Sequence, residues 1–172
     1  MRHIAKGFSL IELLVTVSLV GILAAIAIPN FTSTLQSNKA DTELNDLQRA
    51  LNYARLEAIN RGVSVRIAPT TGTAWNTELQ VYRVSDAGTV ASGSTRVLRK
   101  VAAMSSGGTL VAANVNAIDF NNLGGLIAPA TAVAMTYTRG SVTKTLNICL
   151  TGRIVLGGSC RCPINPDIAR AA

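Results

Sequence analysis

The chain has 172 residues, of which 48% are hydrophobic and 15% are charged. This near-average composition excludes an intrinsically disordered chain and a membrane protein of many spans, and the length allows one ordinary domain with an appendage. Lysine and arginine outnumber aspartate and glutamate by 16 to 9, which gives a formal net charge of +7. The excess collects towards the C-terminus, where it would favour an anionic partner.

The first strong feature in chain order is an apolar run near the N-terminus. No charged residue lies between Glu12 and Lys39, and most positions in that interval are apolar. The apolar part is close to the ~20 residues that cross a ~30 Å hydrocarbon layer as a helix, and Arg2 and Lys6 predict a cytoplasmic N-terminal end. A secretory signal peptide has a similar pattern, but it gains nothing from a carboxylate that costs about 2–3 kcal/mol inside a membrane.

Helical periodicity continues beyond the apolar run. One face of an amphipathic helix is predicted from apolar residues at steps of three and four, namely Leu44, Leu47, Leu51, Ala54 and Ala58. The opposite face is predicted to hold the charged residues Asp41, Glu43, Asp46, Arg49, Arg55 and Glu57. A helix over residues 8–61 would be roughly 80 Å long, with Gly62 as its stop and with bends or loosening at Gly21 and Pro29.

The remainder of the chain is predicted to be β-rich. Short runs of β-branched and aromatic residues alternate with turn-forming pairs, and the runs read as strands over 64–68, 79–84, 96–101, 117–120, 133–137 and 145–149. The predicted fold class is therefore α+β. A long N-terminal helix, transmembrane in its first half and amphipathic in its second, packs against an antiparallel β-sheet head.

The residues at the start of the apolar run resemble a known signal. Gly7-Phe8-Ser9-Leu10-Ile11-Glu12, with Pro29 further along, resembles the class III signal of type IV pilins and type II secretion pseudopilins. The resemblance implies that a prepilin peptidase cuts after Gly7 and methylates the new amino group of Phe8. It also implies that Glu12 pairs with the terminal amine of a neighbouring subunit during assembly, which fixes the axial register of the helices.

A second resemblance covers the C-terminal half. Phe120-x-x-x-Gly124, the run Cys149-Leu150-Thr151-Gly152-Arg153-Ile154 and the helix end at 53–58 are similar to the GspH/FimT family of minor pilins and secretion pseudopilins. This resemblance implies the pilin fold and a single-pass inner-membrane protein with a periplasmic head. The implied divisions are a leader peptide, a transmembrane or filament-core helix, an amphipathic helix and the β-rich head, over residues 1–7, 8–30, 31–62 and 63–172.

Three cysteines, Cys149, Cys160 and Cys162, lie in the last 24 residues. In an oxidising periplasm one disulfide is expected, and pairing Cys160 with Cys162 would need a strained loop. We favour Cys149–Cys160, worth roughly 2–3 kcal/mol through loop entropy, and leave Cys149–Cys162 open. Three thiolates without a histidine disfavour a zinc site.

The favoured function is structural rather than enzymatic. Cleavage after Gly7 removes His3, which is the chain's one histidine, and the glycine pairs fall between strands and do not form a phosphate-binding loop. We therefore expect no catalytic residues, no metal and no cofactor. The predicted role is that of a minor type IV pilin in initiation or tip assembly, located in the inner membrane and then in the filament. Its expected partners are other major and minor pilins, prepilin peptidase and membrane lipid.

Two alternative functions stay open. One is DNA binding during natural transformation, which some FimT proteins perform through a Gly-Arg-x-Arg motif near the C-terminus. This chain has Gly152-Arg153-Ile154-Val155, so it matches only the first arginine of that motif. Other cations that would compensate are Arg139, Lys144, Arg161 and Arg170. The other alternative is the type II secretion pseudopilin H, which has the same anchor and head type.

Overall fold

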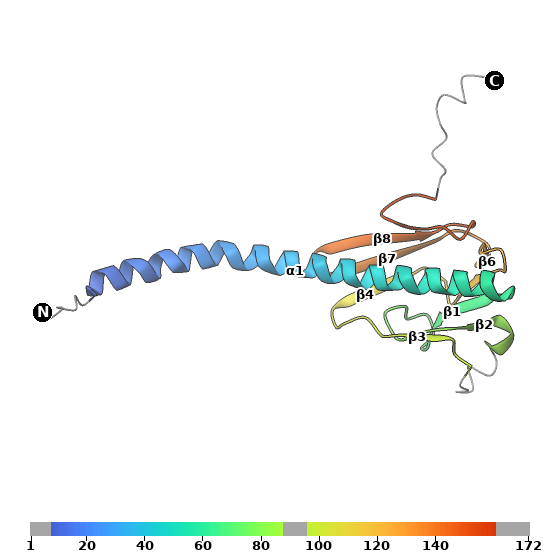
Figure 1. Cartoon of the computed structure of the whole chain (residues 1–172). Helices are drawn as coiled ribbons and strands as arrows, with labels where there is room; N and C mark the ends of the chain where they lie inside the picture. Colours follow the sequence, from blue (N-terminus) through green and yellow to red (C-terminus); the bar gives the residue numbers. More distant parts are fainter. Residues whose placement is uncertain (1–7, 88–95, 161–172) are drawn as a thin grey trace, which may run out of the picture.

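One helix runs the length of the molecule in the computed structural model, which describes residues 8–87 and 96–160. This helix, α1 (Leu10–Arg61), lies against the head with its second half and projects from it with its first half (Figure 1). Gly62 ends it as predicted: the residue has φ 65°, a left-handed conformation that glycine adopts freely, and its N–H donates to the carbonyl of Ile59. The helix is unbroken through position 29 and curves gently over its projecting half, and a specific bend at Pro29 stays a prediction.

The head consists of two antiparallel sheets within the described residues. The first has the strand order β3-β2-β1-β5-β6, and the second has the order β4-β7-β8-β9. A short 3₁₀ helix, η1 (Val84–Asp86), follows β2. The strands are β1 (Val65–Pro69), β2 (Leu79–Arg83), β3 (Arg99–Val101), β4 (Gly108–Ala112), β5 (Ile118–Phe120), β6 (Leu126–Ala128), β7 (Val133–Arg139), β8 (Val142–Ile148) and β9 (Ile154–Leu156).

The predicted α+β architecture is confirmed. All six predicted strand segments contain a strand, although residues 96–98 precede β3 and residue 84 belongs to η1. Three further strands, β4, β6 and β9, were not predicted. β6 and β9 have three residues each, and β4 begins at Gly108, a residue type that is typical of turns.

The core lies between the second half of α1 and the inner faces of both sheets. The predicted apolar stripe of the helix is buried along its whole length, because each of its five residues is at most 2% exposed. Opposite the stripe, alternate strand residues point inward, such as Val65 and Ile67 on β1 and Met135 and Tyr137 on β7. Burying one large apolar side chain stabilises the folded protein by about 1.5–3 kcal/mol relative to leaving it exposed. The amphipathic half of α1, which buries several of them, is therefore an integral part of the head.

Candidate functional site

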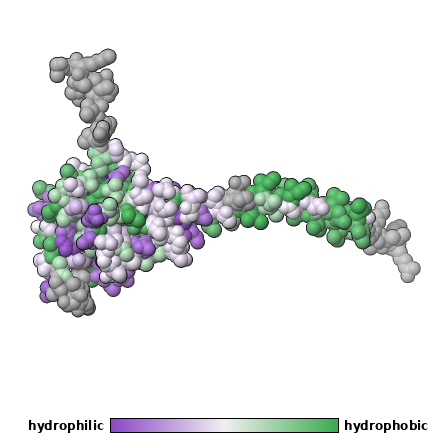
Figure 2. Space-filling view, turned by 180° about the vertical axis from the view of Figure 1, so that it is seen from behind, coloured by the Kyte–Doolittle hydropathy of each residue, from purple (hydrophilic) through white to green (hydrophobic). Residues whose placement is uncertain are grey.

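The projecting half of α1 is an apolar rod that the head does not cover. Its large apolar side chains, from Phe8 to Phe31, are all more than half exposed, and Figure 2 shows them as a nearly continuous green surface. By length and hydropathy this helix could cross a membrane, and none of its most apolar stretch is buried within the molecule. An apolar helix without a polar face is stable only in lipid or among other helices.

The few polar groups of the rod have different environments. The hydroxyl of Thr16 donates to the carbonyl of Leu13 at 2.9 Å, and that of Ser18 donates to the carbonyl of Leu14 at 2.8 Å, so both are satisfied by the helix itself. Glu12 lies in the first turn of α1, where the helix dipole favours a negative charge. Its carboxylate is the one charged group on the rod.

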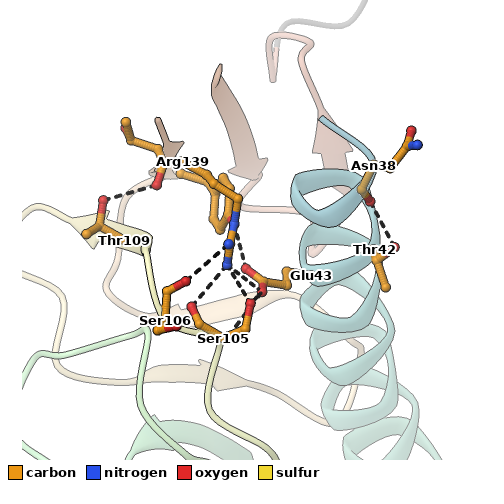
Figure 3. Close-up of polar contacts among 9 residues, drawn as sticks. Asn38, Thr42, Glu43, Ser105, Ser106, Thr109 and Arg139 are labelled. Atoms are coloured by element: carbon orange, nitrogen blue, oxygen red, sulfur yellow. Dashed lines mark hydrogen bonds and ion pairs between the residues drawn. The ribbon is translucent and has the colours of Figure 1, made fainter. Parts of the chain in front are cut away.

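A buried polar cluster joins α1 to the head near the point where the rod begins. Arg139 on β7 donates from Nη2 to Oε1 of Glu43 at 2.9 Å and from Nε to the hydroxyl of Tyr137 at 2.8 Å. Tyr137 in turn donates to Oε2 of Glu43 at 2.5 Å. Ser105 adds its backbone N–H and its hydroxyl, which both donate to Glu43 (Figure 3). We call these four residues the Glu43 cluster.

The cluster shifts the pKa values of its members. Burial on its own raises the pKa of Glu43, but hydrogen bonds from Ser105 and Tyr137 and the charge of Arg139 outweigh it, so the pKa is lowered below 4.5. Burial is also the main cause of the raised pKa of Tyr137, with its hydrogen bond to Glu43 second. Glu43 is therefore ionised and fully engaged at neutral pH.

The cluster corrects two expectations from the sequence. Glu43 was expected on the solvent face of the helix, but its side chain is only 14% exposed. Arg139 was expected to be a surface cation that could help to bind DNA, and this was wrong, because its side chain is only 8% exposed and is paired. The sequence offered no signal for this pair, since the two residues are separated by 96 positions.

A second polar contact fixes the far end of the head. Arg55, also expected to face solvent, donates from Nε to the carbonyl of Gly124 at 2.9 Å and from Nη2 to that of Thr151 at 3.4 Å. The two turns lie so close together that a Cβ on Gly152 would be 1.8 Å from the carbonyl oxygen of Gly124. Glycine at position 152 allows this approach, and glycine at position 124 leaves room for Ile59 and Arg55 of the helix. Arg55 joins the two turns to α1.

The cations considered for DNA binding do not share one surface. Arg153 is exposed next to the Gly152 turn and donates to the carbonyl of Ser159 at 3.4 Å. Lys144 is paired with Asp41 on α1. Asp41 lies about 20 Å along the helix, at 1.5 Å per residue, from Arg55, which contacts the turn next to Arg153. Arg161 and Arg170 lie outside the described residues. A continuous basic groove is therefore not found among the cations whose positions are described.

The disulfide joins the end of β8 to the loop that follows β9. Cys149 and Cys160 are bonded, with their Cα atoms 5.3 Å apart, which is an ordinary separation for a disulfide. This is the favoured pairing, and Cys162 lies outside the described residues. Within residues 8–87 and 96–160, no group of three histidine, cysteine or acidic side chains is arranged to hold a metal ion.

Comparison with known proteins places the chain among pilins. The family model for the type II transport protein GspH matches residues 43–152, which is more than half of the chain. The model for the prokaryotic N-terminal methylation motif matches residues 2–28. The structure of the type IV minor pilin FimU from Pseudomonas aeruginosa superposes with a TM-score of 0.60 and 25% identity, over 75% of this chain and 96% of that one.

Two curated relatives extend the comparison. The narrow-pilus major component PilA5 of Thermus thermophilus is 31% identical over 84% of this chain and 96% of its own length. A fimbrial protein of Pseudomonas aeruginosa is 47% identical, but over only 30% of this chain and 36% of its own length. These proteins are structural pilins, and the methylation motif together with the apolar rod indicates a membrane-anchored one. The chain therefore belongs to the GspH family, within the type IV pilin superfamily.

Proposed function

We propose that this protein is a minor type IV pilin that takes part in starting filament assembly or in forming the filament tip. Residues 8–30 cross the inner membrane, residues 31–62 form the amphipathic half of the helix, and residues 63–172 form a periplasmic head. The observation that carries the proposal is an uncovered apolar rod joined to a head whose fold resembles that of the minor pilin FimU. The same rod is solvated by lipid before assembly and packs against neighbouring helices afterwards.

Processing of the N-terminus is part of the proposal. A prepilin peptidase removes residues 1–7 by cutting after Gly7 and methylates the new amino group of Phe8. This places a positive chain end four residues before Glu12. In the filament the carboxylate of Glu12 pairs with the terminal amine of a neighbouring subunit, because an unpaired carboxylate would be strongly disfavoured among packed apolar helices.

One alternative has specific support. The matching family model is described as a type II transport protein, and a secretion pseudopilin uses the same kind of rod and head. The resemblance to FimU and to PilA5, a pilus component, favours the pilus. The two functions predict different locations, since a minor pilin is found in sheared pili and a secretion pseudopilin is not.

The test is quantitative mass spectrometry of pili sheared from cells that make this protein. We expect the protein in the pilus fraction at far lower abundance than the major pilin, with an N-terminal peptide that begins at methylated Phe8. A matched preparation from cells lacking the gene is the control. A mature chain free in the periplasm and trimmed beyond Ala27 would exclude the proposal, and its absence from pili together with a secretion defect would favour the alternative.

A further inference from the structure

An open pocket lies beside β4, an outer strand of the second sheet. It has a volume of about 660 Å³, which is within the range of about 300–1,000 Å³ typical of ligand-binding clefts. Its walls come from β4 and the residues that follow it, and from Thr73 and Ala74 in the loop between β1 and β2. The cleft between α1 and residues 99–105 has a buried apolar floor, whereas most of the residues that line this pocket are exposed.

The polar side chains of the pocket are neutral and unused. They are the hydroxyl of Thr73 and the amides of Asn114 and Asn116, all on exposed residues. Within residues 8–87 and 96–160 these three side chains make no hydrogen bond. By contrast, Asn121 accepts two backbone N–H groups and Asn147 donates to the carbonyl of Gly158. Because hydroxyls and amides both donate and accept, the free groups of the pocket suit a ligand that carries hydroxyl groups.

The apolar part of the exposed pocket surface consists of small side chains. Val111 is 62% exposed, and Ala113 is also exposed. None of the described residues that line the pocket is aromatic, a methionine or an arginine, which are the types enriched where proteins bind proteins. Methyl groups next to hydroxyls and amides instead complement the mixed C–H and O–H surface of a sugar.

The outer face of the second sheet extends this neutral surface away from the pocket. On that face Val111 of β4 lies opposite Thr136 of β7, which lies opposite Thr145 of β8. The next row across the same three strands consists of threonines, namely Thr109, Thr138 and Thr143. Neither row contains a charged residue, although the chain has 16 basic and 9 acidic residues. We call these two rows the threonine rows, and their lack of cations disfavours a nucleic acid or an anionic lipid as the ligand.

We propose that this pocket and the threonine rows bind a neutral polysaccharide. The amides of Asn114 and Asn116 and the hydroxyl of Thr73 hydrogen-bond one sugar unit in the pocket, and Val111 contacts its C–H groups. The threonine rows lie along the units that follow and offer them further hydroxyls. A ligand that is rich in hydroxyl groups and has no charge matches both parts of this surface. The inference does not rest on the proposed function.

The test uses the full chain in lauryldimethylamine oxide, a detergent without a sugar headgroup, and an array of glucan, mannan and galactan fragments. Sialylated and sulfated glycans on the same array are the anionic probes. We expect binding to a neutral fragment, unchanged between about 0.1 M and 1 M salt because no ion pair forms. In titrations with that fragment, Asn116→Leu should bind about tenfold more weakly, since it loses two hydrogen bonds at similar side-chain size. Asn122→Leu, the same change at an exposed residue of a turn outside the pocket, should bind normally.

A second variant keeps the test decisive. Thr73→Val removes one hydroxyl at nearly constant volume and should weaken binding about threefold. If circular dichroism shows that Asn116→Leu disturbs the fold, Thr73→Val decides the outcome. The proposal is overturned if no neutral fragment binds, if only sialylated or sulfated glycans bind, or if the folded pocket variants bind as tightly as the wild type.

Discussion

Arg139 and Glu43 form an ion pair across 96 positions of sequence, with Nη2 of one 2.9 Å from Oε1 of the other. The pair lies just beyond Ala40, the first buried apolar residue of α1, and therefore close to the point where the rod leaves the head. Because it joins the helix to β7 and to Ser105, it fixes the helix to the head at this junction. A buried ion pair adds little to the net free energy of unfolding, but removing one partner lowers that free energy strongly, because the other charge stays buried and unpaired.

Arg139→Met should therefore lower the free energy of unfolding by about 3 kcal/mol, since it leaves the carboxylate of Glu43 without its cation. The measurement is urea denaturation of the full chain in detergent, followed by the fluorescence of Trp75, the chain's one tryptophan. The control Arg153→Met removes an exposed arginine and should change stability by less than about 0.5 kcal/mol. Equal effects of the two substitutions would contradict the structural role of the pair.

The same cluster predicts a pH dependence. The pKa of Glu43 is lower in the folded protein than its ordinary value of 4.5. A carboxyl of this kind contributes stability that is complete above its unfolded pKa and is lost as the pH falls through its folded pKa. The free energy of unfolding should thus decline below about pH 4.5, and this decline should be smaller in Glu43→Gln. Identical pH profiles for the two proteins would refute this assignment.

The helix was predictable from the sequence because its signals are local. The buried stripe from Leu44 to Ala58 and the stop at Gly62 depend on spacing and on glycine's freedom at positive φ. Glu43 and Arg55 were misplaced for the opposite reason. A charged residue at the border of an apolar stripe is expected to face solvent. Its partner lies on a distant strand or turn, so local periodicity does not indicate that the two residues pair.

The β half was predicted less completely. Longer strands such as β7 alternate clearly, whereas β6 and β9 have three residues each and are defined by pairing partners elsewhere in the chain. The cleft between α1 and residues 99–105 could not be predicted at all, since the residues that line it come from three separate segments of the chain. The N-terminal motif was found from the sequence because its residues are adjacent.

The close approach of two turns predicts that Gly152 tolerates no side chain. Gly152→Ala would place a Cβ 1.8 Å from the carbonyl oxygen of Gly124 at φ +76°, so the turns must separate, and we expect a loss of about 3 kcal/mol or more. Gly157→Ala is the matched control, because it has φ +65° and open space around the added methyl group. That change should cost only about 1–2 kcal/mol in unfolding experiments, and similar losses for both would count against the steric argument.

The disulfide should stabilise the C-terminal loop through chain entropy. The 11-residue separation of Cys149 and Cys160 corresponds to about 2–3 kcal/mol. The comparison is between Cys162→Ser alone and Cys162→Ser combined with serine at both bonded positions, which prevents any exchange of partners. Urea denaturation of both proteins gives the difference. An undiminished stability without the bond would show that the loop is held by its other contacts.

Glu12→Ala is expected to reduce entry into the filament without reducing insertion into the membrane. Alanine removes a costly carboxylate from an apolar rod, so the level in the membrane fraction should be unchanged or higher. Under the pairing proposed above, the same change leaves a neighbouring terminal amine without its partner in the filament, and a loss of about 1.4 kcal/mol of pairing reduces incorporation about tenfold. Thr16→Ala is the control, because its hydroxyl is satisfied by the carbonyl of Leu13 and contributes nothing to a neighbour. Immunoblots of membrane and sheared-filament fractions measure both steps, and filaments that contain Glu12→Ala at the wild-type level would refute the pairing of this carboxylate.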